Sequence, residues 1–254
     1  MGSRGGRSHA GGGGASGGRF AGAQDFLQRA YGGTHARAIL NILQNAPTYI
    51  QQMWEDYGSS FRAARTNPNS TDAYYSPRDN QVYLGINDVA RGGTIYTPYS
   101  TLFHEYGHMT DFLIAREQGH GIYSAYSETY RSGLLGRTAK NELEGHLNRM
   151  MRSDPTLTRR DAAYRLKAEA ESKYSKLDRS DISDMMEGAG IGISHPLGSG
   201  HGTVYWSNRD NGLEIFAEIT SAEAAAPGSL KAIKEYFPKT YDVYREMLKE
   251  RKKR

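Results

Sequence analysis

Residues 99–117 read YSTLFHEYGHMTDFLIARE, and this stretch predicts a single amphipathic helix. At about 100° per residue, one side of the helix is apolar and consists of Leu102, Met109 and Leu113, with Phe112 at its edge. The opposite side carries His104, His108 and Asp111. We therefore expect the helix to enter a hydrophobic core by one face and to present chemically active side chains on the other.

Within that helix, residues 104–108 form an HExxH sequence, HEYGH. Helix geometry places the two histidines one turn apart on one face, where both imidazoles can bind a single zinc ion. Glu105 extends from the edge of that face and can serve as general base toward a water activated by the metal. The alternative is two histidines that bond to backbone or solvent, but it does not explain a two-histidine face opposite an apolar one. Gly107 costs about 1 kcal/mol relative to alanine within a helix, so we expect a backbone or substrate to approach closely there.

A catalytic zinc usually takes three protein ligands and one water, so a third ligand is required. Asp111 lies a further turn along a straight helix, and we assign it to orienting a ligand histidine. Glu214 and Glu218 are better placed, because they share one face of a predicted helix, where two carboxylates repel unless a positive charge lies near. A solvated acidic face is the alternative. Small residues beside the two acids favour close packing instead, and these are Ala217, Ser221 and Ala222.

The remaining pattern predicts an α+β fold that is mostly helical, with a small sheet beside the active helix. Helical periodicity occupies residues 25–57, 137–152, 158–176, 180–187, 212–225 and 228–250, the last with a kink expected at Pro238. Residues 73–76 and 81–86 predict a hairpin, whose second strand could pair with an extended peptide substrate. Loops are expected at 61–71 and 88–98. We expect one domain over 23–250, with a helical insertion at 118–180 that either shapes the cleft or docks a partner.

The composition excludes several classes of protein. The 254 residues contain no Cys, so disulfides, thiolate metal sites and cysteine nucleophiles are ruled out, and any metal must bind His and carboxylates. No apolar run approaches the roughly 18 residues of a membrane span, and no secretory signal is visible, so we expect no membrane association. Location stays open among the cytoplasm, a virion, and export by a specialised system.

The positive charge is concentrated at the two ends of the chain. The net charge is +4. Residues 1–22 contribute three Arg and residues 249–254 contribute five positive charges against one negative, which leaves −3 for residues 23–248. We expect residues 1–22 to form a disordered Gly/Arg-rich tail and 251–254 a basic tail. Such tails can bind nucleic acid weakly, although a flexible linker is the commoner role of this composition.

Two motifs together resemble a known enzyme family. The sequence Phe103-His-Glu-Tyr-Gly-His108 with Asp111, followed by Glu214-Ile-Phe-Ala-Glu218, resembles the gluzincin metallopeptidases of the anthrax lethal-factor-like group, which also occur in phage head-associated proteins and bacterial polymorphic toxins. The similarity covers about residues 72–250 and includes 200–206 and 236–241. It implies a zincin-like domain in which His104, His108 and Glu214 bind zinc. Glu105 is then the general base and Glu218 supports the site.

The same resemblance implies a tyrosine that stabilises the tetrahedral oxyanion. Tyr205 is the candidate, although it stands nine positions ahead of Glu214, farther than the family pattern. His201 competes for this role, since an imidazolium and a phenol can both donate to a developing oxyanion. Packing aromatics are the alternative interpretation of Tyr205 and Trp206. The glycines at 188, 190, 192, 198, 200 and 202 do not form a dinucleotide-binding pattern and predict a mobile loop over the cleft.

The sequence therefore predicts a zinc-dependent endopeptidase that acts on a peptide or protein substrate. One variant of this prediction is a toxin effector with a single host target and a toxin-delivery partner. The alternative from another class is a non-catalytic phage virion or head-associated component that retains the zincin fold.

Overall fold

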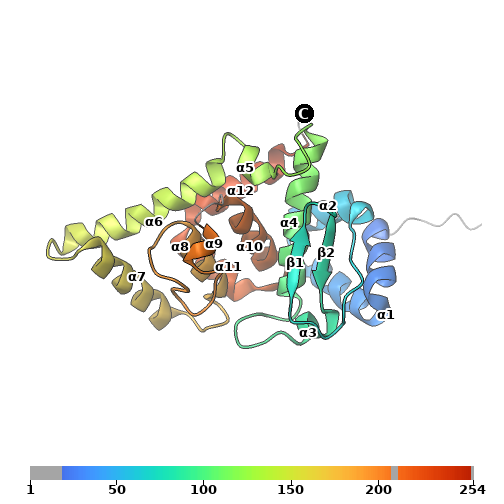
Figure 1. Cartoon of the computed structure of the whole chain (residues 1–254), viewed down its shortest axis with the longest axis horizontal. Coiled ribbons are helices and arrows are strands. Elements are labelled where there is room, and N and C mark those ends of the chain that lie inside the picture. The colour runs from blue at the N-terminus through green and yellow to red at the C-terminus, as the bar shows by residue number, and fades with distance from the viewer. Residues whose placement is uncertain (1–18, 207–210, 253–254) are drawn as a thin grey trace, which may run out of the picture.

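The computed structural model describes residues 19–206 and 211–252. These residues are mostly helical and contain one two-stranded antiparallel sheet, which confirms the α+β class (Figure 1). The predicted tail mostly lies outside the described residues, but its last part is structured: the first helix begins at Ala21, and Arg19 forms an ion pair with Glu55 at 2.5 Å. None of the described helices has the length and apolar character that a membrane span requires.

The predicted helical regions are confirmed, with boundaries shifted by a few residues. The helices are α1 (Ala21–Asn45), α2 (Thr48–Tyr57), the 3-10 turn η1 (Gly58–Ser60), α3 (Ile86–Arg91), α4 (Ser100–Glu117), α5 (Tyr126–Thr129), α6 (Leu134–Ser153), α7 (Arg159–Lys173), α8 (Ser180–Gly188), α9 (Thr203–Trp206), α10 (Gly212–Ala225), α11 (Pro227–Tyr236) and α12 (Pro238–Glu250). The kink expected at Pro238 is a complete break between α11 and α12, because proline lacks an N–H and clashes with the preceding turn. The short helix α3 lies where a loop was expected.

The centre of the fold is the pair α4 and α10, which pack side by side (Figure 1). Gly107 is the point of closest approach: a Cβ there would lie 3.1 Å from the Cα of Ala217 and 3.2 Å from the Cβ of Thr220. The expected close approach at Gly107 is therefore confirmed, and the neighbour is the backbone of α10. This contact brings the HExxH helix against the helix that carries Glu214 and Glu218.

Helix α4 is buried on both of its faces. Leu102 and Met109 lie in the core as expected, whereas Leu113 is only half-buried. Asp111 is completely buried and Glu105 is 6% exposed, so the polar face does not meet open solvent. A periodic pattern distinguishes the two sides of a helix, but it does not show that a second polar-faced helix covers one of them.

The predicted hairpin is confirmed, with a second strand that ends two residues earlier than expected. Strands β1 (Ala73–Ser76) and β2 (Gln81–Leu84) pair so that Ala73 lies opposite Leu84. The outer edge of β2 is already used: the Val82 N–H donates to the Arg62 carbonyl at 3.1 Å, and the Ala64 N–H donates to the Val82 carbonyl at 2.9 Å. The expectation that residues 81–86 offer a free edge to a peptide is therefore wrong. Within the described sheet, the edge without a partner strand is that of β1.

The segment predicted as an insertion, residues 118–180, contributes to the core. Helix α6 packs against α10 and α12, its Leu143 and Leu147 are buried, and α7 folds back along α6 (Figure 1). The Glu142 carboxylate accepts hydrogen bonds from the backbone N–H groups of Lys239 and Thr240, both at 2.8 Å, at the start of α12. A carboxylate at this position satisfies N–H groups that have no partner within the helix. The far end of α6 and α7 projects from the body of the molecule.

Candidate metal centre

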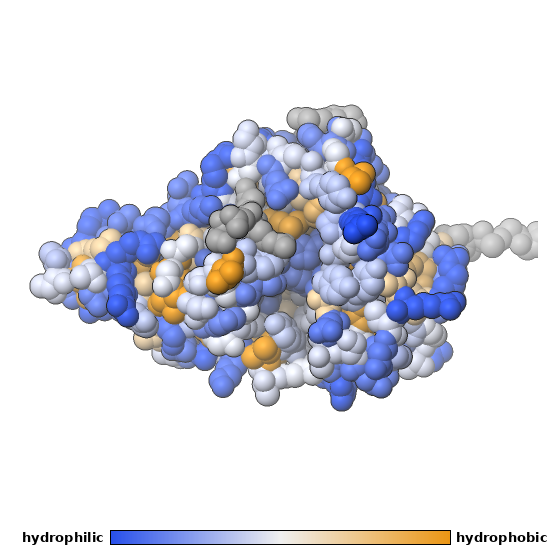
Figure 2. All heavy atoms as spheres, in the orientation of Figure 1, coloured by the Kyte–Doolittle hydropathy of each residue, from blue (hydrophilic) through white to orange (hydrophobic). Residues whose placement is uncertain are grey.

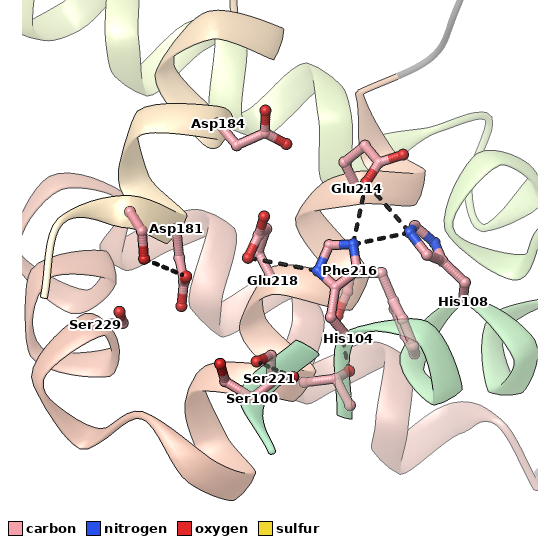
Figure 3. Close-up of polar contacts among 12 residues, drawn as sticks. Ser100, His104, His108, Asp181, Asp184, Glu214, Phe216, Glu218, Ser221 and Ser229 are labelled. Atoms are coloured by element: carbon pink, nitrogen blue, oxygen red, sulfur yellow. Dashed lines mark hydrogen bonds and ion pairs between the residues drawn. The ribbon is translucent and has the colours of Figure 1, made fainter. Parts of the chain in front are cut away.

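Three predicted ligands meet at the contact between α4 and α10. Nε2 of His104 lies 3.1 Å from Nε2 of His108, and Oε2 of Glu214 lies 3.4 Å and 3.2 Å from these two nitrogens (Figure 3). Glu214 is 3% exposed and His108 is 8% exposed. The three ligand atoms therefore converge on one small, mostly buried volume, and this arrangement could hold a metal ion.

The two histidine nitrogens are at hydrogen-bond distance from each other, but the contacts of Glu214 Oε2 with them are not hydrogen bonds. Oε2 of Glu214 is buried, and among the described residues it has no hydrogen-bond partner of acceptable geometry despite the two nearby nitrogens. A buried carboxylate oxygen without a hydrogen bond is costly and calls for an explanation. Lone pairs that point at a common centre, instead of at each other, provide one. The orphaned oxygen is therefore an observation that favours a cation at this position.

Glu218 lies on the other side of the His104 ring. Its Oε2 is 3.5 Å from Nδ1 of His104, and its side chain is 12% exposed. Burial lowers the pKa of His104, but the opposite effect of the Glu218 and Glu214 carboxylates is larger. The net pKa of His104 therefore lies well above the usual value. Burial raises the pKa of Glu214, but His108 and His104 outweigh it, so the net pKa lies well below the usual value. The solvated acidic face considered for these glutamates does not exist in the structure.

Glu105 lies beside the three ligand atoms and faces the cleft. It is 6% exposed and lines the cavities on both sides of the metal centre together with His104. Burial raises the pKa of Glu105, and the neighbouring imidazoles of His104 and His108 act in the opposite direction. A carboxyl whose pKa is raised toward neutrality is suited to accept and release a proton during a reaction.

Tyr205 and His201 both reach this site. The Tyr205 hydroxyl donates a hydrogen bond to Oε1 of Glu214. The His201 ring stacks on the Tyr205 ring with centroids 4.2 Å apart, and Trp206 contacts both rings edge-on. Tyr205 is therefore more than a packing aromatic, because its hydroxyl contacts a candidate ligand.

Two aspartates of α8 complete the site and were missed in the sequence. The carboxylate of Asp184, which is 3% exposed, accepts a hydrogen bond from the His201 backbone N–H at 3.0 Å and contacts Nδ1 of the same ring at 2.9 Å. Burial lowers the pKa of His201, but Asp184 raises it more, to about 9. Asp184, His201 and Glu214 form a second group of side chains that could hold a metal ion. Asp181 lies one turn earlier and near Glu218 (Figure 3).

The same helix holds the glycine-rich loop over the site. The Glu187 carboxylate accepts hydrogen bonds from the backbone N–H groups of His195 and Gly202 at 3.1 Å and 3.0 Å. The Ser183 hydroxyl accepts one from the Leu197 N–H at 2.9 Å. The loop predicted as mobile thus has specific anchors on α8. The sequence signal was present, because Asp181, Asp184 and Glu187 recur every third residue and so share one helix face.

Asp111 does not orient a ligand histidine, contrary to expectation. Its two carboxylate oxygens accept hydrogen bonds from the Ser127 backbone N–H at 2.8 Å and the Ser127 hydroxyl at 2.5 Å. Nδ1 of His108 has no hydrogen-bond partner among the described residues. Asp111 therefore links α4 to α5 and has a structural role. Both of its oxygens are already bonded to Ser127, so neither is bonded to an imidazole.

Two cavities adjoin the candidate metal centre, where the surface is hollowed between the α8 and α9 side and the hairpin side (Figure 2). The first, here called the acidic cavity, has a volume of about 480 Å³ and lies against His104, Glu105, Asp181 and Glu218. The second, the aromatic cavity, has a volume of about 360 Å³ and is lined by Tyr74, Tyr75, Phe112, Tyr205 and Leu213, among others. Ala73 of β1 lines both cavities, so this strand lies beside the cleft.

No protein family model, curated protein or solved structure matches this chain.

Proposed function

We propose that this protein is a zinc-dependent endopeptidase with a zincin-like fold, of the kind found in the lethal-factor-like gluzincins. The observation that carries the proposal is the spacing of the three ligand atoms. A tetrahedral zinc with ligands at about 2.0–2.2 Å separates those ligands by roughly 3.3–3.6 Å. The separations among Nε2 of His104, Nε2 of His108 and Oε2 of Glu214 are 3.1, 3.2 and 3.4 Å, so one lies within this range and two lie 0.1–0.2 Å below it. Two imidazoles and one carboxylate are also a donor set that zinc commonly takes in catalytic sites.

Each residue then has a defined role. Zinc, when bound, supplies a Lewis acid that polarises the peptide carbonyl and lowers the pKa of water. Glu105 accepts the proton of the attacking water and passes it to the leaving amine. The Glu218 carboxylate lies 3.5 Å from Nδ1 of His104 and favours a proton on that nitrogen, which is the tautomer that leaves Nε2 free to bind metal.

Tyr205 and His201 are the two donors that would stabilise the developing oxyanion. Asp184 accepts the hydrogen of Nδ1 of His201 and raises the pKa of that ring to about 9, so the protonated imidazolium can donate to a substrate from Nε2. The Tyr205 hydroxyl, which contacts Glu214, can turn its hydrogen bond toward a substrate oxygen. Donors aimed at the charge that develops in the transition state are among the largest contributions to catalysis.

The edge of β1 gives the substrate a place to bind. An extended peptide can add to an open strand edge through backbone hydrogen bonds, with alternate side chains entering neighbouring pockets. Ala73 lines both cavities, so a peptide along β1 passes the metal centre and offers side chains to each cavity. A specific toxin effector and a general protease would share this site and differ only in substrate.

Metal content and cleavage together test the proposal. We expect about one zinc per chain in the purified protein, cleavage of a mixed peptide library, and loss of that cleavage on chelation. Glu105→Gln should keep the zinc and lose cleavage, because its amide cannot accept the proton. Full activity of Glu105→Gln, or a folded protein that binds no zinc when zinc is offered, would contradict the proposal. Zinc binding without any cleavage by the wild type would favour the non-catalytic virion component.

A further inference from the structure

A third cavity lies at the other strand of the hairpin, away from the candidate metal centre. It is bordered by α1, by the segment 61–68 and by Leu84 of β2, whereas Ala73 of β1 borders the two cavities beside the metal ligands (Figure 1). Its volume is about 700 Å³, larger than that of either of those cavities. None of the residues that line it lines the other two. The cavity is therefore a separate feature of the surface.

Three arginines line this cavity, which we call the basic cavity. They are Arg29 of α1 and Arg62 and Arg65 of the segment 61–68, and all three are exposed. No Asp or Glu is among the described residues that line it. Like charges in one cavity repel each other, and a cavity lined by one sign of charge attracts a ligand of the opposite sign.

The three guanidinium groups are not neutralised by carboxylates. Among the described residues, none of them forms an ion pair, whereas Arg131 and Arg251 pair with Glu246 and Asp56. Arg62 donates only to the backbone carbonyls of Ser59 and Phe61, at 3.1 Å and 2.8 Å. Arg29 and Arg65 form no side-chain hydrogen bond within the described part of the chain. The basic cavity therefore presents charged donors that are available to a ligand.

The spacing of the arginines fits a chain of phosphates. A guanidinium group matches a phosphate because it can donate two parallel hydrogen bonds to it. Residues 62–64 are extended beside β2, since the Val82 N–H donates to the Arg62 carbonyl and the Ala64 N–H donates to the Val82 carbonyl. At about 3.3 Å per residue, the Cα atoms of Arg62 and Arg65 are roughly 10 Å apart. Side chains that start this far apart, with Arg29 on a third element, can reach successive phosphates of one strand.

The floor of the basic cavity is apolar. Phe26, Tyr31 and Phe61 line it together with Leu84 and Ile86. Tyr31 is half-buried, and its hydroxyl is bonded to the Tyr106 hydroxyl at 2.6 Å, which fixes the ring. Unpaired bases can contact aromatic and aliphatic surface, whereas the bases of a duplex are already stacked in pairs. A cavity that combines this floor with arginines favours a single strand.

We propose that the basic cavity binds single-stranded nucleic acid, with Arg29, Arg62 and Arg65 at the phosphates and Tyr31 beside a base. The sequence that leads into α1 has the same sign of charge, because residues 1–18 contain two Arg and no Asp or Glu. Binding here requires neither zinc nor peptide cleavage. Its test is therefore independent of the test of the proposed function.

Fluorescence anisotropy of a labelled oligothymidylate of about twelve nucleotides measures binding to the full chain. Three phosphate contacts to a single strand predict a slope of about −2 for the logarithm of the binding constant against that of the salt concentration. Arg29→Gln combined with Arg65→Gln should weaken binding at least about tenfold and make this slope shallower by about 1.4. Both side chains are exposed, so we expect this variant to fold, and urea unfolding verifies that it does.

Arg152→Gln combined with Arg160→Gln is the matched control. It removes the same charge from two exposed arginines of α6 and α7 that form no ion pair among the described residues and do not line the basic cavity. The control should bind within about twofold of the wild type, because salt screens exposed charges that are far from the ligand. A duplex of the same oligonucleotide with its complement is the second comparison. It carries about twice the charge per unit length, so charge alone would favour the duplex, and we expect the single strand to bind more tightly.

Four results would overturn the inference. The first is absence of oligonucleotide binding by the wild type, and the second is an equal loss of affinity in the two double variants. The third is tighter binding of the duplex, and the fourth is equally tight binding of an oligoglutamate of the same charge. Unchanged binding by the Arg29 and Arg65 variant would also contradict it, because the basic ends of the chain would then account for the affinity.

Discussion

Oε2 of Glu218 lies 3.5 Å from Nδ1 of His104, while Nε2 of the same ring faces Glu214 and His108 (Figure 3). The His104 ring thus has one carboxylate, that of Glu218, at Nδ1 and another, that of Glu214, at Nε2. A carboxylate behind a ligand histidine orients the ring and raises its basicity as a ligand.

Removing Glu218 should therefore weaken zinc binding without removing a ligand. We expect Glu218→Ala to lower zinc affinity by about 10–100-fold. Competition with a chromophoric chelator measures this affinity. Glu223→Ala is the control on the same helix, because Glu223 accepts a hydrogen bond from Tyr241 and lies outside the site. Equal zinc affinity in the Glu218 variant and the wild type would show that this contact does not support the metal.

A methyl group at Gly107 should destabilise the protein, because its Cβ would lie 3.1 Å from the Cα of Ala217 and 3.2 Å from the Cβ of Thr220 in α10. We expect Gly107→Ala to lower the free energy of unfolding by about 1–3 kcal/mol, as overpacking in a core does. Gly145 in α6 is the matched control, since its nearest outside atom is the end of the Arg149 side chain at 3.6 Å. Gly145→Ala should stabilise the protein by up to about 1 kcal/mol. Urea unfolding of both variants tests the pair, and the idea fails if Gly107→Ala is as stable as the wild type.

The parts of the site that sequence reasoning anticipated are those with short, regular spacing. His104, Glu105 and His108 follow from one helix turn, and Glu214 and Glu218 from another, so a local rule was sufficient. The close approach at Gly107 was also predictable. A glycine destabilises a helix relative to alanine, and a close neighbour that leaves no room for a Cβ explains why it is there.

The parts that were missed depend on contacts between distant segments. Asp184 acquires its role only when the irregular loop brings His201 back to α8. Asp111 shares the histidine side of α4, but the position of Ser127 decides its partner. The hairpin was recognised from its alternating pattern. Which of its edges stays open depends on the chain near Ala63, which bridges to Val82 of β2. An alternating pattern within the strands does not reveal such a distant partner.

Asp184 should matter for turnover more than for substrate binding. Among the described residues, it forms no hydrogen bond or ion pair with the three proposed zinc ligands. Its contact is with Nδ1 of His201, at 2.9 Å. If His201 stabilises the transition state, Asp184→Asn should lower kcat by about ten- to a hundredfold and leave KM nearly unchanged. Steady-state kinetics on a cleaved peptide separate the two constants. A rise in KM with an unchanged kcat would instead assign Asp184 to substrate binding.

Asp111 should make the stability of the protein fall as the pH rises. Complete burial raises its pKa from 3.8 to about 8, although the hydrogen bonds from Ser127 lower it. Between about pH 4 and about pH 8 the carboxyl is thus ionised in the unfolded chain and protonated in the folded one. The unfolded state binds fewer protons in this window, so each pH unit costs up to about 1.4 kcal/mol of unfolding free energy.

Asp111→Asn cannot ionise, and its amide can still accept the hydrogen bond from the Ser127 N–H. We therefore expect the free energy of unfolding of Asp111→Asn, relative to that of the wild type, to increase steadily across the window from about pH 4 to about pH 8. Urea unfolding of both proteins at matched pH values and equal zinc gives this difference, in which contributions common to both proteins cancel. Parallel pH profiles would mean that Asp111 is ionised in the folded protein. Its contact with Ser127 would then be a charged hydrogen bond that stabilises the α4 and α5 junction, instead of a buried carboxyl kept neutral at some cost.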